Sequence, residues 1–365
     1  MTTLRVLLHV AAQRYYELHS LDFSTAFLQG SLNEEIWLRC PPGFTETTLA
    51  ALGFAPATAD PSLFLRTDTS LPPFYVLVYV DDLVFATAYI EALTLVKSEL
   101  QKRHTCTDLG ELRSYLGLQI TRDRARRTIT LTQSHMVLQV LQRFGFQFSS
   151  PRPTPLSTSH SLSAPPSDES VEPSGPYPEL VGCLILLRGS RQALKGALRG
   201  PVVLTGQADA SWVDDSATQR SSQGYTFSLG YGSVSWWSTC SSSVLSSSCE
   251  VEIYAGAMAA QELRWITYLL TDLGEQPRSP PVLYVDNKAM IALCQEHRLE
   301  HRTKHIALRY FLARELQQRG QLRLAYVATQ ANTADVFTKA LLLCDHQRFV
   351  TVLGLVPTLP HLLTS

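Results

Sequence analysis

Two adjacent aspartates, Asp81 and Asp82, stand between apolar runs at residues 74–78 and 83–86. This pattern predicts a β-hairpin with both carboxylates at its tip, and a helix is expected after it over residues 90–103. Because the flanking strands are apolar enough to be buried, each carboxylate costs several kcal/mol unless a cation or a hydrogen-bond donor offsets its charge. The pair therefore indicates a metal site, and an ordinary surface turn is an equally good explanation of the dipeptide alone.

Asp22 adds a third carboxylate, at the end of a short apolar strand upstream of this hairpin. Two divalent ions about 3.5–4 Å apart can activate a 3′-hydroxyl and stabilise a leaving pyrophosphate. Asp22 and Asp81 are suited to bridge both ions. The three acids together therefore favour phosphoryl-transfer chemistry over a plain turn.

Four more acids lie at strand ends and helix starts in the second half of the chain. Asp209 and Asp286 are expected to close strands, Glu252 to lie in the first turn of a long helix, and Asp335 to open the last helix. The predicted elements there are three strands, a long helix from about residue 250 to 270, and then strand, helix, helix, strand and helix. Each acid alone is commonly a helix cap or a solvated side chain. Their joint placement at one sheet edge predicts an α/β domain with ribonuclease H architecture.

Several motifs of the first half occur in the order found in one family. They are the runs 21–30, 34–44, 59–64, 79–82 and 108–117. Together they resemble the reverse transcriptase of copia-type LTR retrotransposons. The resemblance implies that Asp22, Asp81 and Asp82 are the polymerase carboxylates, with Asp82 the least direct metal ligand. It also implies that Phe27 lies under the sugar and rejects a 2′-hydroxyl, although a core aromatic is an equally good explanation of Phe27.

The second half carries a further set of motifs that is similar to the ribonuclease H domain of the same elements. They are the runs 209–212, 246–252, 284–287, 301–306 and 332–339. The resemblance implies that the four acids bind two Mg²⁺ ions, or Mn²⁺ in their place, and hydrolyse RNA in an RNA/DNA hybrid. Arg302, Lys304 and His305 would then contact substrate phosphates. Glu250 is expected to be structural, since it points some 200° away from Glu252 on the helix.

The expected organisation is an α+β polymerase palm/thumb remnant followed by an α/β ribonuclease H-like domain with a mixed five-stranded sheet and flanking helices. The expected boundaries are 1–148 for the partial palm and thumb, 149–200 for a Ser/Pro-rich linker and truncated connection, 201–342 for the ribonuclease H-like domain and 343–365 for a tail. The chain has 365 residues, of which 45% are hydrophobic, enough for sizeable cores.

Charge and composition limit the partners. The net charge of −1 gives no global attraction to nucleic acid, so binding must come from local basic segments. Residues 297–309 are expected to contact substrate. Residues 122–127 are expected to form a solvated turn between strands at residues 118–121 and 128–131, with phosphate contact as the secondary possibility. No membrane span or secretory signal is expected. The predicted location is intracellular, in cytoplasmic particles or the nucleus, and the sequence does not predict an oligomeric state.

The first half also departs from the family. Its members carry about thirty more residues after the run 41–44, within a palm segment that contacts nucleotide and template. Polymerisation with primer-template and dNTPs is therefore expected to be impaired, and hydrolysis to survive better. The alternatives are an inert or merely nucleic-acid-binding remnant and a metal-dependent phosphohydrolase of small molecules, which would not explain the basic residues around Lys304.

Overall fold

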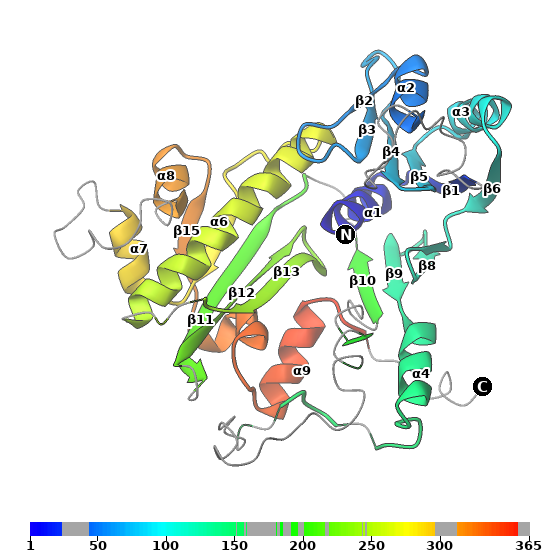
Figure 1. The fold of residues 1–365 in the computed structure, drawn as a ribbon. Coiled ribbons are helices and arrows are strands. Elements are labelled where there is room, and N and C mark those ends of the chain that lie inside the picture. The colour runs from blue at the N-terminus through cyan, green and yellow to red at the C-terminus, as the bar shows by residue number, and fades with distance from the viewer. Residues whose placement is uncertain are drawn as a thin grey trace, which may run out of the picture. The chain divides into compact units, whose positions relative to one another are not determined.

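Figure 1 shows the computed structural model of the chain as a ribbon. It describes residues 1–23, 44–150, 152–156, 158, 180, 183–184, 191–195, 201–215, 219–242, 244, 247–295 and 312–356. The chain divides into two compact units. Unit 1 comprises residues 1–129, 195–200 and 268–276, and unit 2 comprises residues 130–194, 201–267 and 277–365. The predicted domain boundaries stay predictions.

Unit 1 is built on a six-stranded antiparallel sheet with the strand order β2-β3-β4-β5-β1-β6. Its strands are β1 (Glu17–Phe23), β2 (Phe54–Pro56), β3 (Leu63–Arg66), β4 (Phe74–Tyr79), β5 (Asp82–Thr87) and β6 (Cys106–Glu111). Its helices are α1 (Thr2–Arg14), α2 (Phe44–Ala51) and α3 (Ile90–Arg103). The predicted hairpin is thus confirmed as β4 and β5, and the predicted helix over residues 90–103 as α3.

Large apolar side chains form the core of unit 1. Phe74 and Phe85 from the hairpin pack with Leu93 and Leu100 of α3, and all four are almost completely buried. Residues 268–276 also belong to this unit, where the Tyr75 hydroxyl donates to the Leu273 carbonyl over 2.7 Å. The hairpin that bears Asp81 and Asp82 therefore packs into a dense apolar core.

The basic turn at residues 122–127 differs from the expectation. Arg122 donates to the Tyr16 carbonyl over 2.5 Å, and Arg124 makes two hydrogen bonds to the Glu17 carboxylate, of 2.9 and 2.5 Å. Arg127 donates to the Tyr15 hydroxyl. Arg126 keeps 83% of its side chain exposed. The predicted solvated turn is confirmed, since residues 124–127 form a turn and residues 124–126 are exposed. The difference is that most of its cations nevertheless bind the C-terminal end of α1 and the start of β1.

A four-stranded sheet follows, with the order β10-β9-β8-β7. Its strands are β7 (Ser114–Tyr115), β8 (Leu118–Asp123), β9 (Thr128–Thr132) and β10 (Arg191–Lys195), and helix α4 (Ser134–Arg143) comes directly after β9. The strand pair predicted at residues 118–121 and 128–131 is confirmed as β8 and β9.

Unit 2 contains a mixed five-stranded sheet with the order β13-β12-β11-β14-β15. The strands are β11 (Thr205–Asp215), β12 (Arg220–Ser228), β13 (Ser233–Cys240), β14 (Val282–Val285) and β15 (Arg323–Tyr326). The first three pair antiparallel, whereas β14 pairs parallel with both β11 and β15. Parallel neighbours need long crossovers. Helices α6 (Ser248–Asp272), α7 (Lys288–Gln295) and α8 (Leu312–Gln318) supply them.

Helix α6 buries a narrow stripe of small and aliphatic residues. Ala255, Ala259, Leu263, Ile266 and Leu270 recur at helical spacing and are at most 1% exposed. This stripe fixes the rotation of the helix, and with it the direction of the acids in its first turn. The mixed five-stranded sheet with flanking helices is confirmed.

Two expected boundaries differ from the structure. Strand β11 does not close at Asp209 but continues to Asp215, because β12 extends its pairing after β14 has ended at Val285. Asp335 does not open the last helix. It lies in the 3-10 helix η5 (Thr333–Phe337), and helix α9 (Leu343–Val352) begins eight residues later. Within the described ranges, every helix is too short or too polar to cross a lipid bilayer.

Candidate metal centre

The register of two parallel strands places Asp209 and Asp286 side by side. Ala208 of β11 is the pairing partner of Val285 of β14, and the next residue of each strand is an aspartate. Strand β14 ends at Val285, so Asp286 lies just beyond the parallel ladder, while β11 continues through Asp209 paired with β12. The two aspartates therefore lie beside each other where the parallel ladder ends. Asp209 is completely buried there, whereas Asp286 is half-buried.

Asp335 reaches this edge because the segment before it is fastened to β11. The buried Asn332 donates a hydrogen bond from Nδ2 to the Ala208 carbonyl over 3.0 Å. Its Oδ1 accepts a hydrogen bond from the Ala334 amide. Gln207 accepts hydrogen bonds from the amide and the hydroxyl of Thr333. One carboxylate oxygen from each of Asp209, Asp286 and Asp335 then lies within 4.8 Å of the other two. Among the described residues this is the one such group of three.

Gly224 lets η5 approach the sheet this closely. It is the pairing partner of Asp209 on β12, and a Cβ at this position would lie 2.6 Å from the Phe337 Cβ and 3.2 Å from the Trp237 carbonyl. Both contacts are shorter than real Cβ contacts normally are. The absence of a side chain at Gly224 is thus a condition for the position of Asp335.

Lys339 bridges two of the acids. Its Nζ lies 3.0 Å from an oxygen of Asp209 and 3.0 Å from an oxygen of Asp335, while the Thr338 hydroxyl donates to the second oxygen of Asp209. Burial lowers the pKa of the Lys339 ammonium, but the two carboxylates outweigh burial and the pKa is raised. Sequence reasoning did not assign Lys339. Its spacing of four residues from Asp335 was the available signal.

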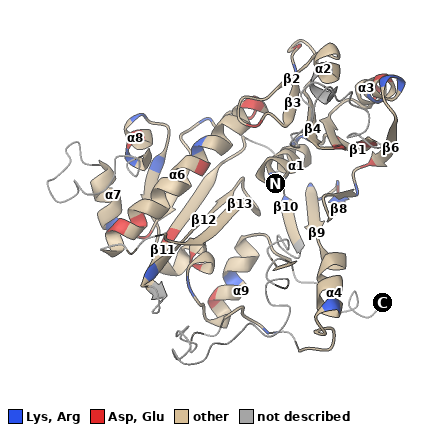
Figure 2. Ribbon diagram, in the orientation of Figure 1, with Lys and Arg blue, Asp and Glu red and all other residues tan. Residues whose placement is uncertain are grey.

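Glu252 completes the group from the first turns of α6. Its Oε2 is buried and has no hydrogen-bond partner. Burial, followed by the charges of Asp209 and Asp286, raises the pKa of Glu252 to about 9. Figure 2 shows acidic residues where this end of α6 and β11 come together. The arrangement fits a divalent cation, because a cation would satisfy the unpartnered oxygen and offset the repulsion among the carboxylates.

The acids of unit 1 are arranged differently. Asp22 of β1 is the pairing partner of Asp82 of β5, and the Phe23 amide donates to the Asp81 carbonyl over 2.9 Å. Burial, followed by the charges of Asp22 and Asp81, raises the pKa of Asp82. The turn contains Val80 with a φ of 57°. Strand β1 and the β4–β5 hairpin thus place the three predicted polymerase residues near one another, but their carboxylate oxygens do not converge within 4.8 Å as those of unit 2 do. Within the described part of the chain no ion pair joins them to a cation.

Some predicted site residues lie outside the described residues. These are Phe27, Arg302, Lys304 and His305. Their roles stay predictions, as does the substrate contact proposed for residues 297–309.

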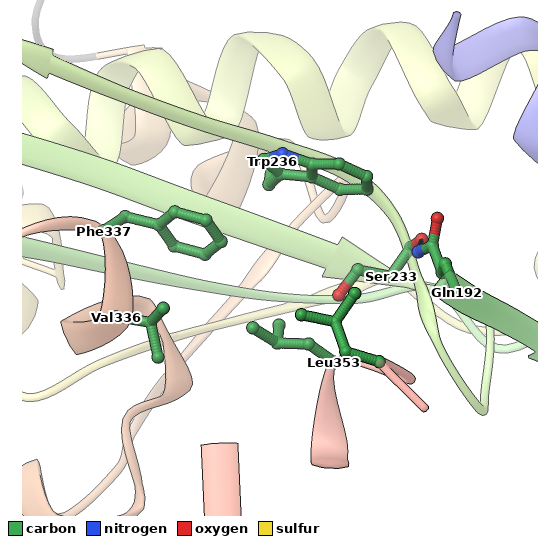
Figure 3. Close-up of a pocket in the computed structure, with 7 residues that line it drawn as sticks. Gln192, Ser233, Trp236, Val336, Phe337 and Leu353 are labelled. Carbon is green, nitrogen blue, oxygen red and sulfur yellow. Dashed lines mark hydrogen bonds between the residues drawn. The ribbon is translucent and has the colours of Figure 1, made fainter. Parts of the chain in front are cut away.

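A pocket of about 110 Å³ lies next to η5 in unit 2. Figure 3 shows Phe337 and Val336 facing the same space as Trp236 and Leu353. Its lining holds no carboxylate. The pocket is therefore mainly apolar and is distinct from the group of acids. Val336 and Phe337, which follow Asp335 in sequence, form part of its wall.

Comparison with known proteins agrees with the sequence motifs. The family described as "Reverse transcriptase (RNA-dependent DNA polymerase)" matches residues 45–158. The Pol polyprotein of the Arabidopsis thaliana transposon RE2 is 30% identical over 426 positions, which take in 98% of this chain and 29% of the relative. Over nearly its whole length the chain is similar to copia-type retrovirus-related Pol polyproteins of transposons. The polyprotein of transposon TNT 1-94 from Nicotiana tabacum is 28% identical, in an alignment that covers 93% of this chain and 31% of the relative.

These Pol polyproteins are more than three times as long as the chain, which spans less than a third of each. The alignment with the RE2 polyprotein has 426 positions, more than the 365 residues of the chain, so the relative carries residues that this chain lacks. Among solved structures, the N-terminal RNase H domain of a Mycobacterium tuberculosis protein is 12% identical with a TM-score of 0.28, covering 40% of this chain and 98% of that one.

Proposed function

We propose that the ribonuclease H-like part of this Pol segment hydrolyses the RNA strand of RNA/DNA hybrids with divalent metal ions. Asp209, Glu252, Asp286 and Asp335 would hold two ions, Mg²⁺ or Mn²⁺. The observation that carries the proposal is the convergence of three carboxylates within 4.8 Å beside a fourth whose buried oxygen has no partner. The chain's similarity to Pol polyproteins supplies the substrate class.

Each residue of the centre has a separate task in this proposal. Asp209 is central, since its charge acts on both Glu252 and Asp335. The Thr338 hydroxyl fixes its orientation. Bound metal ions would lower the pKa of a water molecule and offset charge on the phosphate that it attacks. Burial, followed by the charge of Asp209, raises the pKa of Asp335, and a bound cation would offset this repulsion.

We further propose that unit 1 is the remnant of a polymerase palm and that its polymerase activity is weak or lost. Asp22, Asp81 and Asp82 would be its metal-binding carboxylates, and primer-template and dNTPs its ligands. The residues that relatives carry and this chain lacks favour the loss. The same observation favours the alternative of an inert remnant for unit 1.

We infer an intracellular location, in cytoplasmic particles or the nucleus.

The test is cleavage of the RNA strand in a labelled hybrid by the purified chain with Mg²⁺. Asp286→Asn should reduce the cleavage rate by more than about 100-fold, because replacing even an outer-shell partner of a metal ligand commonly costs 10–100-fold. The matched control is Asp345→Asn on α9, whose side chain pairs with Arg348 on the surface. Cleavage that persists in Asp286→Asn would contradict the site assignment.

A further inference from the structure

The four acids of the metal centre divide into two sides around Asp209. On one side, Asp209 and Asp335 share the Lys339 ammonium at equal distances of 3.0 Å. On the other side, Glu252 has a buried oxygen without a partner, and burial and the charges of Asp209 and Asp286 act on it. The Lys339 ammonium is in contact with the acids of one side. Its charge also acts on Glu252, but among the described residues no ion pair joins a cation to Glu252 or Asp286.

We propose that Lys339 holds one of the two cation positions of the centre and must leave before a second divalent ion binds. This inference rests on the proposed metal-dependent function. The position beside Glu252 and Asp286 takes the first ion, and the position between Asp209 and Asp335 takes the second. Lys339 is thus a positioning residue that sets the metal concentration at which the centre is fully loaded.

Electrostatics makes the two cations compete. A divalent ion held by Asp209 and Asp335 would lie a few ångströms from the ammonium, where like charges repel strongly in a partly buried site. Both carboxylates would also have to give up hydrogen bonds to Lys339. The second ion therefore binds more weakly than it would to the same carboxylates without the lysine.

The side chain is built so that it can leave. Lys339 keeps 32% of its side chain exposed, on a flexible four-carbon stem, whereas Asp209 is fully buried. The Thr338 hydroxyl holds the second oxygen of Asp209 independently of the lysine. Withdrawal of Lys339 into water would therefore leave the orientation of Asp209 unchanged.

A purely structural ion pair predicts the opposite behaviour. If Lys339 only held Asp335 in place, removing its charge would loosen the carboxylates and weaken metal binding. The sign of the change in metal affinity therefore separates the two explanations, and activity is not needed to observe it.

The experiment is calorimetric titration of the metal-stripped full chain with Mn²⁺, for wild type, Lys339→Gln and Lys339→Arg. Wild type should show a first ion and a second that binds more weakly. Lys339→Gln should tighten the second ion by at least about tenfold, since a neighbouring like charge is removed. Lys339→Arg keeps the charge and should behave as wild type. Lys102→Gln is the matched control, because Lys102 is exposed on α3 and pairs only with Glu99 among the described residues.

The outcomes are separable. A second ion that binds Lys339→Gln as weakly as wild type, or more weakly, overturns the proposal, and it leaves the proposed function standing if wild type cleaves the hybrid. Mn²⁺ binding to neither protein overturns both. If circular dichroism shows that Lys339→Gln does not fold, Lys339→Met retains the apolar stem and carries the same expectation.

Discussion

The two groups of acids in this chain are assembled in different ways. In unit 1, Asp22 and Asp82 are paired across neighbouring strands, and Asp81 lies in the adjoining turn. In unit 2, the acids come from two parallel strands, a long helix and a 3-10 helix, and Lys339 joins two of them. The first group needs only a hairpin and one more strand. The second needs most of its domain.

Because of this difference, the two groups of acids are not equally good evidence for an intact site. Antiparallel pairing alone keeps Asp22 near Asp82, so this closeness does not depend on the rest of unit 1. The second group forms only when Gln207, Asn332 and Gly224 hold η5 against β11. Its convergence is therefore stronger evidence for a retained function than the closeness of the acids in unit 1.

The largest effect that we expect to separate the two groups of acids is the change in thermal stability of unit 2 with pH. The pKa of Glu252 is raised to about 9 in the folded protein, from an ordinary value near 4.5. The folded chain therefore keeps a proton that the unfolded chain loses, and this stabilisation is present at low pH and is lost as pH rises through about 9. Between pH 6 and 9 without metal, the melting temperature of wild type should fall by several degrees more than that of Glu252→Gln, since each kcal/mol shifts it by about 2–4 °C.

Saturating Mg²⁺ provides the control for this titration. A bound cation favours the ionised carboxylate, so it should remove most of the pH dependence of wild type. Equal pH dependence in wild type and Glu252→Gln, measured by thermal melting in EDTA, would show that Glu252 is not held in its neutral form.

A smaller effect is expected from Gly224→Ala, which breaks the fastening of η5. The added methyl group would meet the backbone of Trp237 and the Cβ of Phe337, neither of which can swing away. We expect a loss of about 1–3 kcal/mol in unfolding free energy. Hybrid cleavage should also fall, because Asp335 and Thr338 move with η5.

Gly256→Ala is the matched control for that substitution. Its methyl group would meet the terminal methyl and, at 3.1 Å, the sulfur of Met290, which form the end of a flexible side chain and not backbone, and α6 gains a better helix former. Chemical denaturation and cleavage rates check both variants. An unchanged cleavage rate in Gly224→Ala would mean that η5 tolerates displacement.

The smallest effect concerns the basic turn of unit 1. Arg124→Gln removes a half-exposed pair with Glu17 and should change the free energy of unfolding by less than about 1 kcal/mol. Hybrid affinity, measured by fluorescence anisotropy, should not change, because Arg124 binds the chain itself. Arg126→Gln, at the exposed end of the turn, is the control. A drop in affinity specific to Arg124→Gln would restore a phosphate-binding role.

Local patterns predicted the helices and strands well where one signal dominates. The amphipathic run at residues 90–103 became α3, and the apolar runs around Asp81 became β4 and β5. The end of β11 could not be predicted, because it depends on how far β12 pairs beyond β14. The course of residues 332–338 depends on hydrogen bonds to Gln207 and Ala208, which are over a hundred residues away in sequence.

The candidate site was predictable in its acids but not in its cation. Asp209 and Asp286 follow apolar strands, and parallel pairing then dictates that they meet. Lys339 lies in the run 332–339 without a predicted role, because only the tertiary position of Asp209 turns it into a bridge between two acids. The same logic explains the basic turn, where the partners of Arg122 and Arg124 come from the first seventeen residues.

The most direct test of the central claim is to measure two activities on one preparation of the full chain with Mg²⁺. Hybrid cleavage and primer extension are followed on the same labelled RNA/DNA primer-template, with Asp286→Asn and Asp81→Asn beside wild type. We predict cleavage that Asp286→Asn removes and Asp81→Asn retains, without measurable extension. Extension that Asp81→Asn abolishes, in a protein that cleaves no RNA, would contradict the account.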